Sequence, residues 1–401
     1  MKQSFYTANR QATAKATRGG LTVLTAYSLM QRSGDMASKF DQEANFWYLT
    51  GIDESDWWVI IDGSSDKSWL VAPDVDEIHR IFEGGMTFEE AKNVSGIQEV
   101  IRHADSEALL RRLSKKHSLV YTLGDHPHRD YFNFVENPAQ KKLTAVLERT
   151  FNGVQDCRKE LSKLRAIKQP EEIAAMKKAI KLTNEAFIIA KEKLSECKYE
   201  YEVEAEFDYY FKRNGVGHAY DRVVAAGKNA CTMHYVRNDA KLKKGSLLLI
   251  DIGAKYNNYS ADITRTYAIG EPTKRQVMVH KVIERSHNAI IKLLKPGLSI
   301  AAYHEQVDVI MKQALIELGL LQNTDDTSRY RTYFPHAISH GLGIDPHDPL
   351  GAPTTFQEGM VLTVEPGIYI PEEGIGVRLE DDILITKNGH DNLSKHLSTG
   401  L

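Results

Sequence analysis

The chain has 401 residues, of which 42% are apolar and 26% are charged, and its formal net charge is -3. A single domain usually has about 100–200 residues, so this length predicts a globular protein of two or three domains. The nearly balanced charge excludes the basic field that nucleic-acid-binding proteins need. No stretch approaches the roughly 20 consecutive apolar residues of a membrane span, so a membrane partner is not expected either.

The cysteines and the N-terminal segment indicate the cellular compartment in which the protein is expected. Cys157, Cys197 and Cys231 are widely spaced and form no CxxC pair. They indicate neither a disulfide framework nor a thiolate zinc site, and they fit a reducing cytoplasm. The first 20 residues carry charge but lack the apolar segment of a secretory signal. We therefore expect a cytoplasmic protein.

The first 158 residues alternate short apolar runs with helical segments. The runs at residues 22–27, 57–63, 68–73 and 119–124 have the length and composition of strands, and residues 88–94 have a helical pattern. This alternation predicts an α/β domain over residues 1–158. A charged connector at residues 157–173 then leads into the rest of the chain.

Two long helices are predicted in residues 159–401, which we assign to a second domain. Pro170 fits the first turn of a helix, where its missing N–H costs nothing, and apolar residues follow at helical spacing. Thr273 and Gln276 form a capping-box pattern ahead of a second helix, which Pro296 and the glycine after it should stop.

Two aspartates mark a pair of strands between these helices. Asp251 ends the apolar run LLLID, and Asp262 lies in a second strand-like run beyond a turn rich in asparagine and tyrosine. Side chains alternate along a strand, so Asp262, Thr264 and Thr266 should share one face. Antiparallel strands joined by this turn can bring the two carboxylates together.

Two glutamates and a group of histidines follow. Glu365 ends an apolar strand at a Pro-Gly turn, and Glu380 shares a strand face with Arg378. His340 lies between His336 and His347 in a segment rich in small residues. Carboxylates on apolar strands need either a neutralising cation or a solvated face.

Each of these residues also has an ordinary structural interpretation. An aspartate at a strand end usually belongs to a turn, a glutamate before proline is common at the surface, and one histidine is more often structural than catalytic. Their joint occurrence favours a site in which two divalent metals satisfy four carboxylates and an imidazole.

The order of these residues resembles that of the pita-bread metallopeptidases. The resemblance extends over residues 159–390 and rests on the segments IDIGAKYNNYSADITRT, SHGLGIDPHD, TVEPGIY and GVRLEDD. The first domain, with ANFWYLTG at residues 44–51, resembles that of the Xaa-Pro aminopeptidases (aminopeptidase P) and the related prolidases. The implied fold is α+β, with a C-terminal pita-bread (creatinase/aminopeptidase) domain behind a smaller α/β N-terminal domain.

The resemblance also implies metal ligands. Asp251 would chelate one metal, His340 and Glu365 would hold the other, and Asp262 and Glu380 would bridge them. A metal-bridging hydroxide would then attack the Xaa-Pro bond, and Glu365 would pass its proton towards the proline nitrogen. Carboxylate-rich ligation without thiols favours Mn²⁺, with Co²⁺, Fe²⁺ or Zn²⁺ as alternatives.

Five further residues receive roles in the pocket by the same resemblance. His234 resembles the substrate-orienting histidine, His336 and His347 resemble the pair that flanks the scissile bond, and Tyr220 and Arg378 match positions that line or brace the pocket. On local chemistry alone, packing accounts for His234, packing is favoured over substrate contact for Tyr220, and an ion pair with a neighbouring acid accounts for Arg378.

The expected function is that of an Xaa-Pro aminopeptidase acting on peptides with proline in the second position. The alternatives are a prolidase, which cleaves Xaa-Pro dipeptides, and a non-catalytic pita-bread protein that binds peptides or proteins. Creatinase-like hydrolysis without metal is disfavoured because Asp251 and Asp262 are both present. Gly341, Ala337 and the short stretch between Glu365 and Glu380 depart from the family pattern, so the choice between dipeptides and longer peptides stays open. The resemblance further suggests a homodimer or homotetramer.

Overall fold

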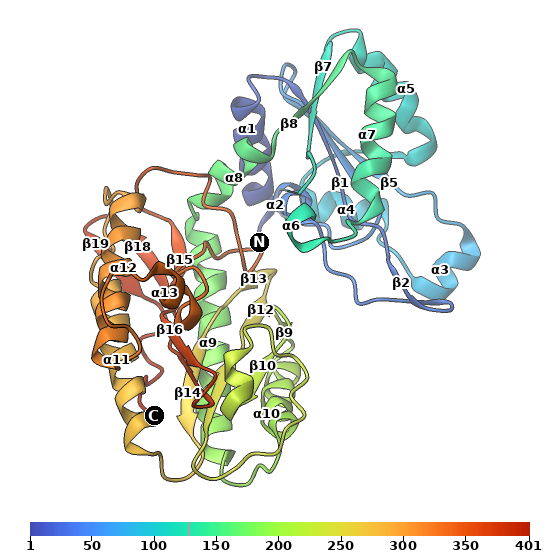
Figure 1. The fold of residues 1–401 in the computed structure, drawn as a ribbon. Coiled ribbons are helices and arrows are strands. Elements are labelled where there is room, and N and C mark those ends of the chain that lie inside the picture. The colour runs from blue at the N-terminus through green and yellow to red at the C-terminus, as the bar shows by residue number, and fades with distance from the viewer. Residues whose placement is uncertain (127–128) are drawn as a thin grey trace. The chain divides into compact units, whose positions relative to one another are not determined.

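The computed structural model describes residues 1–126 and 129–401 and divides into two compact units (Figure 1). Unit 1 is Met1–Leu164 and unit 2 is Arg165–Leu401. The boundary expected at residue 158 is the first residue of helix α8 (Arg158–Ala166), and the division between the units falls inside that helix. None of the helices in the described ranges is both long enough and apolar enough to span a bilayer.

Unit 1 contains a six-stranded mixed sheet in the order β6-β5-β4-β1-β7-β8. Strand β4 is antiparallel to both β1 and β5, whereas β5–β6, β1–β7 and β7–β8 are parallel pairs. The four runs predicted as strands are β1, β4, β5 and β7 of this sheet. The strands of unit 1 are β1 (Leu21–Thr25), β2 (Gln31–Ser33), β3 (Met36–Ala37), β4 (Trp58–Asp62), β5 (Lys67–Ala72), β6 (Glu99–Arg102), β7 (Leu119–Thr122) and β8 (Gly153–Asp156).

Helices α5 and α7 pack on this sheet and complete its core. Leu110 of α5 and Leu143 and Leu147 of α7 are fully buried with Val23 and Ile60 of the sheet. The helix predicted at residues 88–94 is α4, which a capping box at Thr87 begins. The helices that start in unit 1 are α1 (Gln3–Ala16), α2 (Ala44–Thr50), α3 (Glu77–Glu83), α4 (Phe88–Ser95), α5 (His103–Ser114), α6 (Arg129–Phe132), α7 (Pro138–Thr150) and α8.

Unit 2 begins with the long helix that Pro170 was expected to open. Pro170 is the first residue of α9, and the capping box of Thr273 and Gln276 opens α11, which ends at Ile291, ahead of Pro296. The helices of unit 2 are α9 (Pro170–Lys193), α10 (Glu200–Arg213), the 3-10 helix η1 (Gly227–Cys231), α11 (Lys274–Ile291), α12 (Ile300–Glu317) and α13 (Thr327–Tyr333).

Antiparallel strands of unit 2 lie between the α9–α10 pair and the α11–α12 pair (Figure 1). They form small sheets in the orders β10-β11-β14, β13-β12-β9, β15-β18-β19 and β16-β17. A backbone bridge joins Thr264, at the start of β14, to Glu380, between β17 and β18. The strands are β9 (Gly217–His218), β10 (Val223–Ala226), β11 (Leu247–Asp251), β12 (Ala254–Tyr256), β13 (Tyr259–Ser260), β14 (Thr264–Ala268), β15 (Val361–Val364), β16 (Gly367–Ile370), β17 (Ile375–Arg378), β18 (Asp381–Thr386) and β19 (Gly389–Asn392).

Candidate metal centre

The pairing of β11 with β14 brings two of the acids together. Asp251, the last residue of β11, lies opposite Thr264, the first residue of β14, and Asp262 lies two residues before Thr264. The Tyr220 hydroxyl is 2.7 Å from Asp251 Oδ1 and 2.6 Å from Asp262 Oδ1. Two carboxylates from one hairpin thus meet at a single phenol.

Gly253 permits this close approach. A Cβ atom at Gly253 would lie 1.7 Å from the carbonyl oxygen of Ala261 and 3.0 Å from the Tyr220 ring. No other residue fits at that distance, because even alanine would overlap the opposite backbone. Gly253, two residues after Asp251, is therefore required by the geometry that brings Asp251 close to Asp262.

The segment before His340 runs alongside β15 and positions the imidazole. The Glu365 N–H donates to Ile338 O at 3.0 Å, and the Thr363 N–H donates to His340 O at 3.0 Å. His340 Nε2 consequently lies 3.4 Å from Glu365 Oε1 and 3.5 Å from Asp262 Oδ2.

Glu380 is fixed by the bridge to β14. Its N–H donates to Thr264 O at 3.1 Å, and the Thr264 hydroxyl donates to Glu380 Oε2 at 2.6 Å. One potential ligand atom from each of Asp262, His340 and Glu380 lies within 4.8 Å of the other two. The five residues singled out in the sequence therefore form a single buried or half-buried cluster.

The charge of this cluster fits bound cations. Burial, reinforced by the neighbouring carboxylates, raises the pKa of Asp262, Glu365 and Glu380 well above the usual range. Arg378 pairs with Asp251, but one guanidinium cannot neutralise four carboxylates. Buried anions without compensation are costly, and oxygen-rich donor sets with one imidazole suit divalent metals.

His340 is neutral and presents a lone pair to the acids. Burial and the nearby His347 lower the pKa of His340 to about 3. Its Nδ1 lies 3.0 Å from Gly341 O, which assigns the ring proton to Nδ1. The lone pair on Nε2 is then free to bind a cation, as in metal-bound histidines whose other nitrogen donates to a carbonyl.

His336 and His347 lie on either side of His340 in the chain and adjoin the acids differently. His336 Nδ1 is 3.6 Å from Glu365 Oε2, and burial together with Arg378 lowers the pKa of His336 to about 4. His347 is exposed, and its ring lies over that of His340 with the centroids 4.0 Å apart.

Arg378 and Tyr220 contact the acids directly, whereas His234 does not in the described part of the chain. Arg378 Nη2 pairs with Asp251, and Tyr220 is bonded to Asp251 and Asp262. His234 is exposed in the turn after η1, and neither a hydrogen bond nor an ion pair joins it to the acids among the described residues. Its neighbours in that turn pack against a cluster that includes Tyr369.

Tyr369 was not singled out in the sequence. The Arg378 Nη1–H donates to the Tyr369 oxygen at 2.9 Å, and the Tyr369 hydroxyl lies 2.8 Å from His336 Nε2. Because Arg378 already donates to it, Tyr369 donates its proton to His336 and leaves the imidazole proton on Nδ1. In the sequence, Tyr369 is only an aromatic residue after a Pro-Gly turn. Its contact with Arg378 forms because β16, which carries Tyr369, pairs with β17, which ends at Arg378.

The connector before α9 supplies a second group that the sequence did not reveal. Arg165 and Lys168, which lie in the connector described from the sequence as charged, are only 2% and 5% exposed. Both pair with Asp348, and the distance from Lys168 Nζ to Asp348 Oδ2 is 2.8 Å. Asp348 N–H also donates to Gly341 O at 2.8 Å. This ion group therefore fixes both ends of the loop between His340 and His347.

Comparisons with known proteins identify the family of the chain. Residues 174–387 match metallopeptidase family M24, and residues 6–121 match the N-terminal domain of aminopeptidase P. The chain belongs to the metal-dependent family M24, in the group of Xaa-Pro aminopeptidases and prolidases. The expected fold, a pita-bread domain behind an α/β N-terminal domain, is thereby confirmed.

Two relatives and one solved structure illustrate the similarity. The chain is 31% identical to the Xaa-Pro aminopeptidase of Escherichia coli, over 98% of this chain and 94% of the relative. It is 30% identical to the Xaa-Pro dipeptidase of Pyrococcus furiosus, over 88% and 91%. A low-pH crystal form of E. coli aminopeptidase P aligns with a TM-score of 0.87 at 30% identity, over 100% of this chain and 96% of that one.

Proposed function

We propose that this protein is an Xaa-Pro aminopeptidase that depends on two divalent metal ions and hydrolyses the bond before a proline in position two. The observation that carries the proposal is the convergence of Asp262, Glu365 and Glu380 on a neutral His340. Asp251 is joined to this group through the Tyr220 hydroxyl that it shares with Asp262. Asp251 would hold one ion, His340 and Glu365 the other, and Asp262 and Glu380 would bridge them.

The bound ions would supply a water whose pKa falls from about 15.7 towards 7. Glu365 is placed to move the proton of that water. Its carboxylate lies beside His340 and 3.6 Å from His336 Nδ1. Burial and nearby anions raise the pKa of Glu365, so the carboxyl group can hold a proton and release it to the departing proline nitrogen.

The hydrogen-bonded series Arg378–Tyr369–His336 would keep Glu365 oriented. Arg378 and Tyr369 fix the tautomer of His336, whose Nδ1–H points to Ala337 O at 2.7 Å and towards Glu365. We assign the exposed His347 to the peptide carbonyl, where an N–H donor would stabilise the developing oxyanion. His234 is assigned to substrate orientation, and Tyr220 and Arg378 to bracing the pocket.

Manganese is the metal we expect, because the donors are mostly carboxylates, with cobalt, iron and zinc as alternatives. We place the protein in the cytoplasm, which agrees with three free cysteines. A homodimer or homotetramer is expected, and light scattering that shows a monomer alone would contradict it.

The deciding experiment compares an Xaa-Pro dipeptide and an Xaa-Pro-Xaa tripeptide as substrates of metal-stripped protein, with and without manganese. Manganese-dependent cleavage of both is the expected result. Cleavage of the dipeptide alone would assign the chain to the prolidases. The similarity to the P. furiosus dipeptidase is the reason to test this alternative. Failure of both with every divalent metal would favour a non-catalytic peptide-binding protein.

The two-metal assignment has its own test. Replacing Asp251 and Asp262 together by alanine should reduce turnover by more than about 100-fold, because even outer-shell partners of metals cost about 10–100-fold. The matched control is Asp35→Ala with Asp41→Ala, at two exposed positions of unit 1, which should retain full activity. Unchanged turnover after replacement of both Asp251 and Asp262 would refute the two-metal mechanism.

A further inference from the structure

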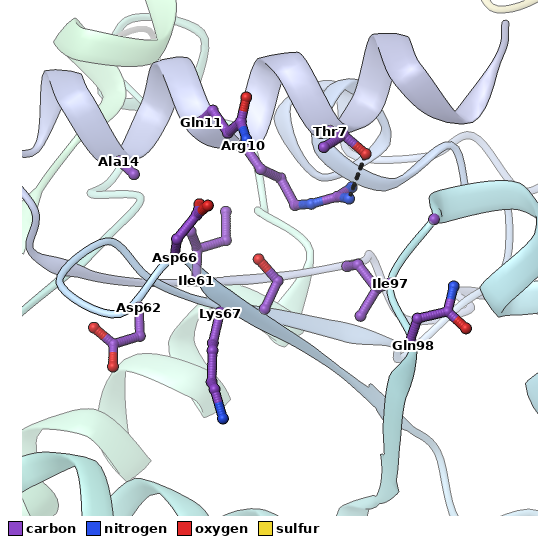
Figure 2. Close-up of a pocket in the computed structure, with 12 residues that line it drawn as sticks. Thr7, Arg10, Gln11, Ala14, Ile61, Asp62, Asp66, Lys67, Ile97 and Gln98 are labelled. Carbon is purple, nitrogen blue, oxygen red and sulfur yellow. Dashed lines mark hydrogen bonds between the residues drawn. The ribbon is translucent and has the colours of Figure 1, made fainter.

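Unit 1 contains a polar pocket whose lining shares no residue with the metal centre (Figure 2). The pocket has a volume of about 190 Å³ and lies between helix α1, the β4–β5 hairpin and the segment that follows α4. A cavity of about 150 Å³ accommodates benzene, and drug-sized ligands need roughly 300–1,000 Å³. The pocket therefore suits a molecule of only a few heavy atoms.

Arg10 brings a buried positive charge to this pocket. Arg10 as a whole is only 5% exposed, and its side chain extends beneath α1 towards Thr7 (Figure 2). Nη1 donates to Leu49 O at 2.8 Å and Nη2 donates to Thr7 Oγ1 at 3.1 Å. Of the five N–H groups of a guanidinium, three remain.

Among the described residues, no ion pair joins Arg10 to a carboxylate. Leu49 is near the C-terminal end of α2, whose dipole supplies roughly half a negative charge at most. Burial lowers the pKa of Arg10 to about 10, so the group is still a cation at neutral pH. A buried cation with so little compensation favours an anionic ligand.

The pocket also contains a carboxylate without a protein partner. Asp66 lies in the turn between β4 and β5, is exposed, and has neither an ion pair nor a hydrogen bond to any residue that the structure describes. Asp62 differs, because Ser64, Ser65 and His117 occupy its oxygens. In Figure 2, Asp62 and Lys67 point away from α1, whereas Arg10 and Asp66 lie between the helix and the strands.

The lining thus combines two cations, Arg10 and Lys67, with the Asp66 carboxylate, and no ion pair joins these groups among the described residues. Inorganic phosphate or another polyanion would meet Arg10 but also the repulsion of Asp66. A zwitterion avoids this conflict. Gln11 and Gln98 add amide donors and acceptors for its polar atoms. We propose that this pocket binds a free α-amino acid, with its carboxylate on Arg10 and its ammonium group towards Asp66.

The tryptophans provide a readout restricted to unit 1. All four, Trp47, Trp57, Trp58 and Trp69, belong to this unit. Trp69 follows Ser68, which lines the pocket, and its Nε1–H donates to Glu99 at 2.5 Å, next to Gln98. Ligand binding in the pocket should therefore change tryptophan fluorescence.

The experiment titrates the metal-stripped full-length protein with glycine and, separately, with acetate. We expect a saturable fluorescence change with glycine. Arg10→Gln should weaken that binding by about 10-fold or more, because hydrogen bonds to charged groups contribute about 1.5–3 kcal/mol. Asp66→Asn should weaken glycine binding and leave acetate binding unchanged. Lys15→Gln, at an exposed position of α1 outside the lining, is the matched control and should change neither.

Two results would overturn the proposal. The absence of a saturable change with glycine would leave Arg10 as a cap of α2 alone, and equal affinities for glycine and acetate would remove the role of Asp66. If Arg10→Gln does not fold, the wild-type titrations and the exposed Asp66→Asn variant still decide. Because the protein is free of metal, the outcome is independent of peptidase activity.

Discussion

The hydroxyl of Tyr220 is hydrogen-bonded to one oxygen of Asp251 and to one oxygen of Asp262, at 2.7 and 2.6 Å. A phenol has one proton and can donate to only one of the two carboxylates at a time. The second contact therefore needs an additional positive charge, either a proton on one of the acids or a cation. Burial and the two aspartates raise the pKa of Tyr220, so the phenol itself stays protonated.

Tyr220→Phe removes this hydroxyl while it preserves the ring. We expect manganese affinity to fall by about 10–100-fold, the usual effect of losing an outer-shell partner. Calorimetric titration of metal-stripped protein measures the change. Tyr209→Phe, at an exposed position of α10, is the matched control and should bind manganese like the wild type. Equal affinities in both variants would show that the phenol does not support the metal ligands.

The raised pKa values of Asp262, Glu365 and Glu380 predict how the stability of metal-free protein depends on pH. A carboxyl group whose pKa is higher in the folded state holds a proton that the unfolded chain releases above about pH 4, so stability falls as pH rises through this window. His340 and His336, with lowered pKa values of about 3 and 4, act in the opposite direction, but only up to about pH 6.5.

Above about pH 6.5 the two histidines no longer contribute, and the raised pKa values of the carboxyl groups predict that the melting temperature of metal-stripped protein decreases as pH rises further. Saturating manganese should abolish this decrease, and Glu380→Gln should reduce it, because one titrating group has been removed. Thermal unfolding followed by circular dichroism at several pH values provides the test. A melting temperature of the metal-free protein that increases over this range would contradict the electrostatic account of the site.

Tyr369→Phe should act on catalysis rather than on metal binding. The substitution removes the hydrogen bonds to His336 and Arg378, and the imidazole that faces Glu365 loses its fixed tautomer. We expect kcat to fall by about 10-fold, the equivalent of one hydrogen bond of roughly 1.4 kcal/mol, with little change in manganese affinity. Steady-state kinetics on an Xaa-Pro-Xaa tripeptide measures the effect, and His336→Ala should reduce kcat at least as much. A Tyr369→Phe enzyme with unchanged kcat would remove Tyr369 from the proposed series.

Asp348→Asn should destabilise the protein strongly. It leaves the buried cations of Arg165 and Lys168 without their shared carboxylate, and breaking a buried ion pair costs about 3–5 kcal/mol. Asp345→Asn is the matched control, because Asp345 also contacts Arg165 but its side chain is 49% exposed. Denaturant unfolding of both variants, with manganese present throughout, gives the comparison. Similar unfolding free energies would mean that Asp348 is dispensable to the fold of the loop.

Local sequence was sufficient to locate strands at the acids and two of the long helices of unit 2. Apolar runs ending in Asp251 and Glu365 predicted strand ends, and Pro170 and the Thr273–Gln276 box predicted helix starts, all of which the structure shows. These signals are readable because strand periodicity, caps and proline geometry act over fewer than ten residues. The family resemblance added the role of each of the five candidate ligands.

Contacts between distant segments were decided only by the tertiary structure. Tyr369 meets His336 across 33 residues, and Lys168 meets Asp348 across 180, so neither pair has a local pattern in the sequence. The same holds for Arg10, which reads as one more charge on an amphipathic helix until burial and the lack of a carboxylate partner are known. Sequence determines which groups are available and on which face of each element they lie. Only packing fixes which charges lose water together, and that loss of solvent sets the pKa values and the demand for bound cations or ligands.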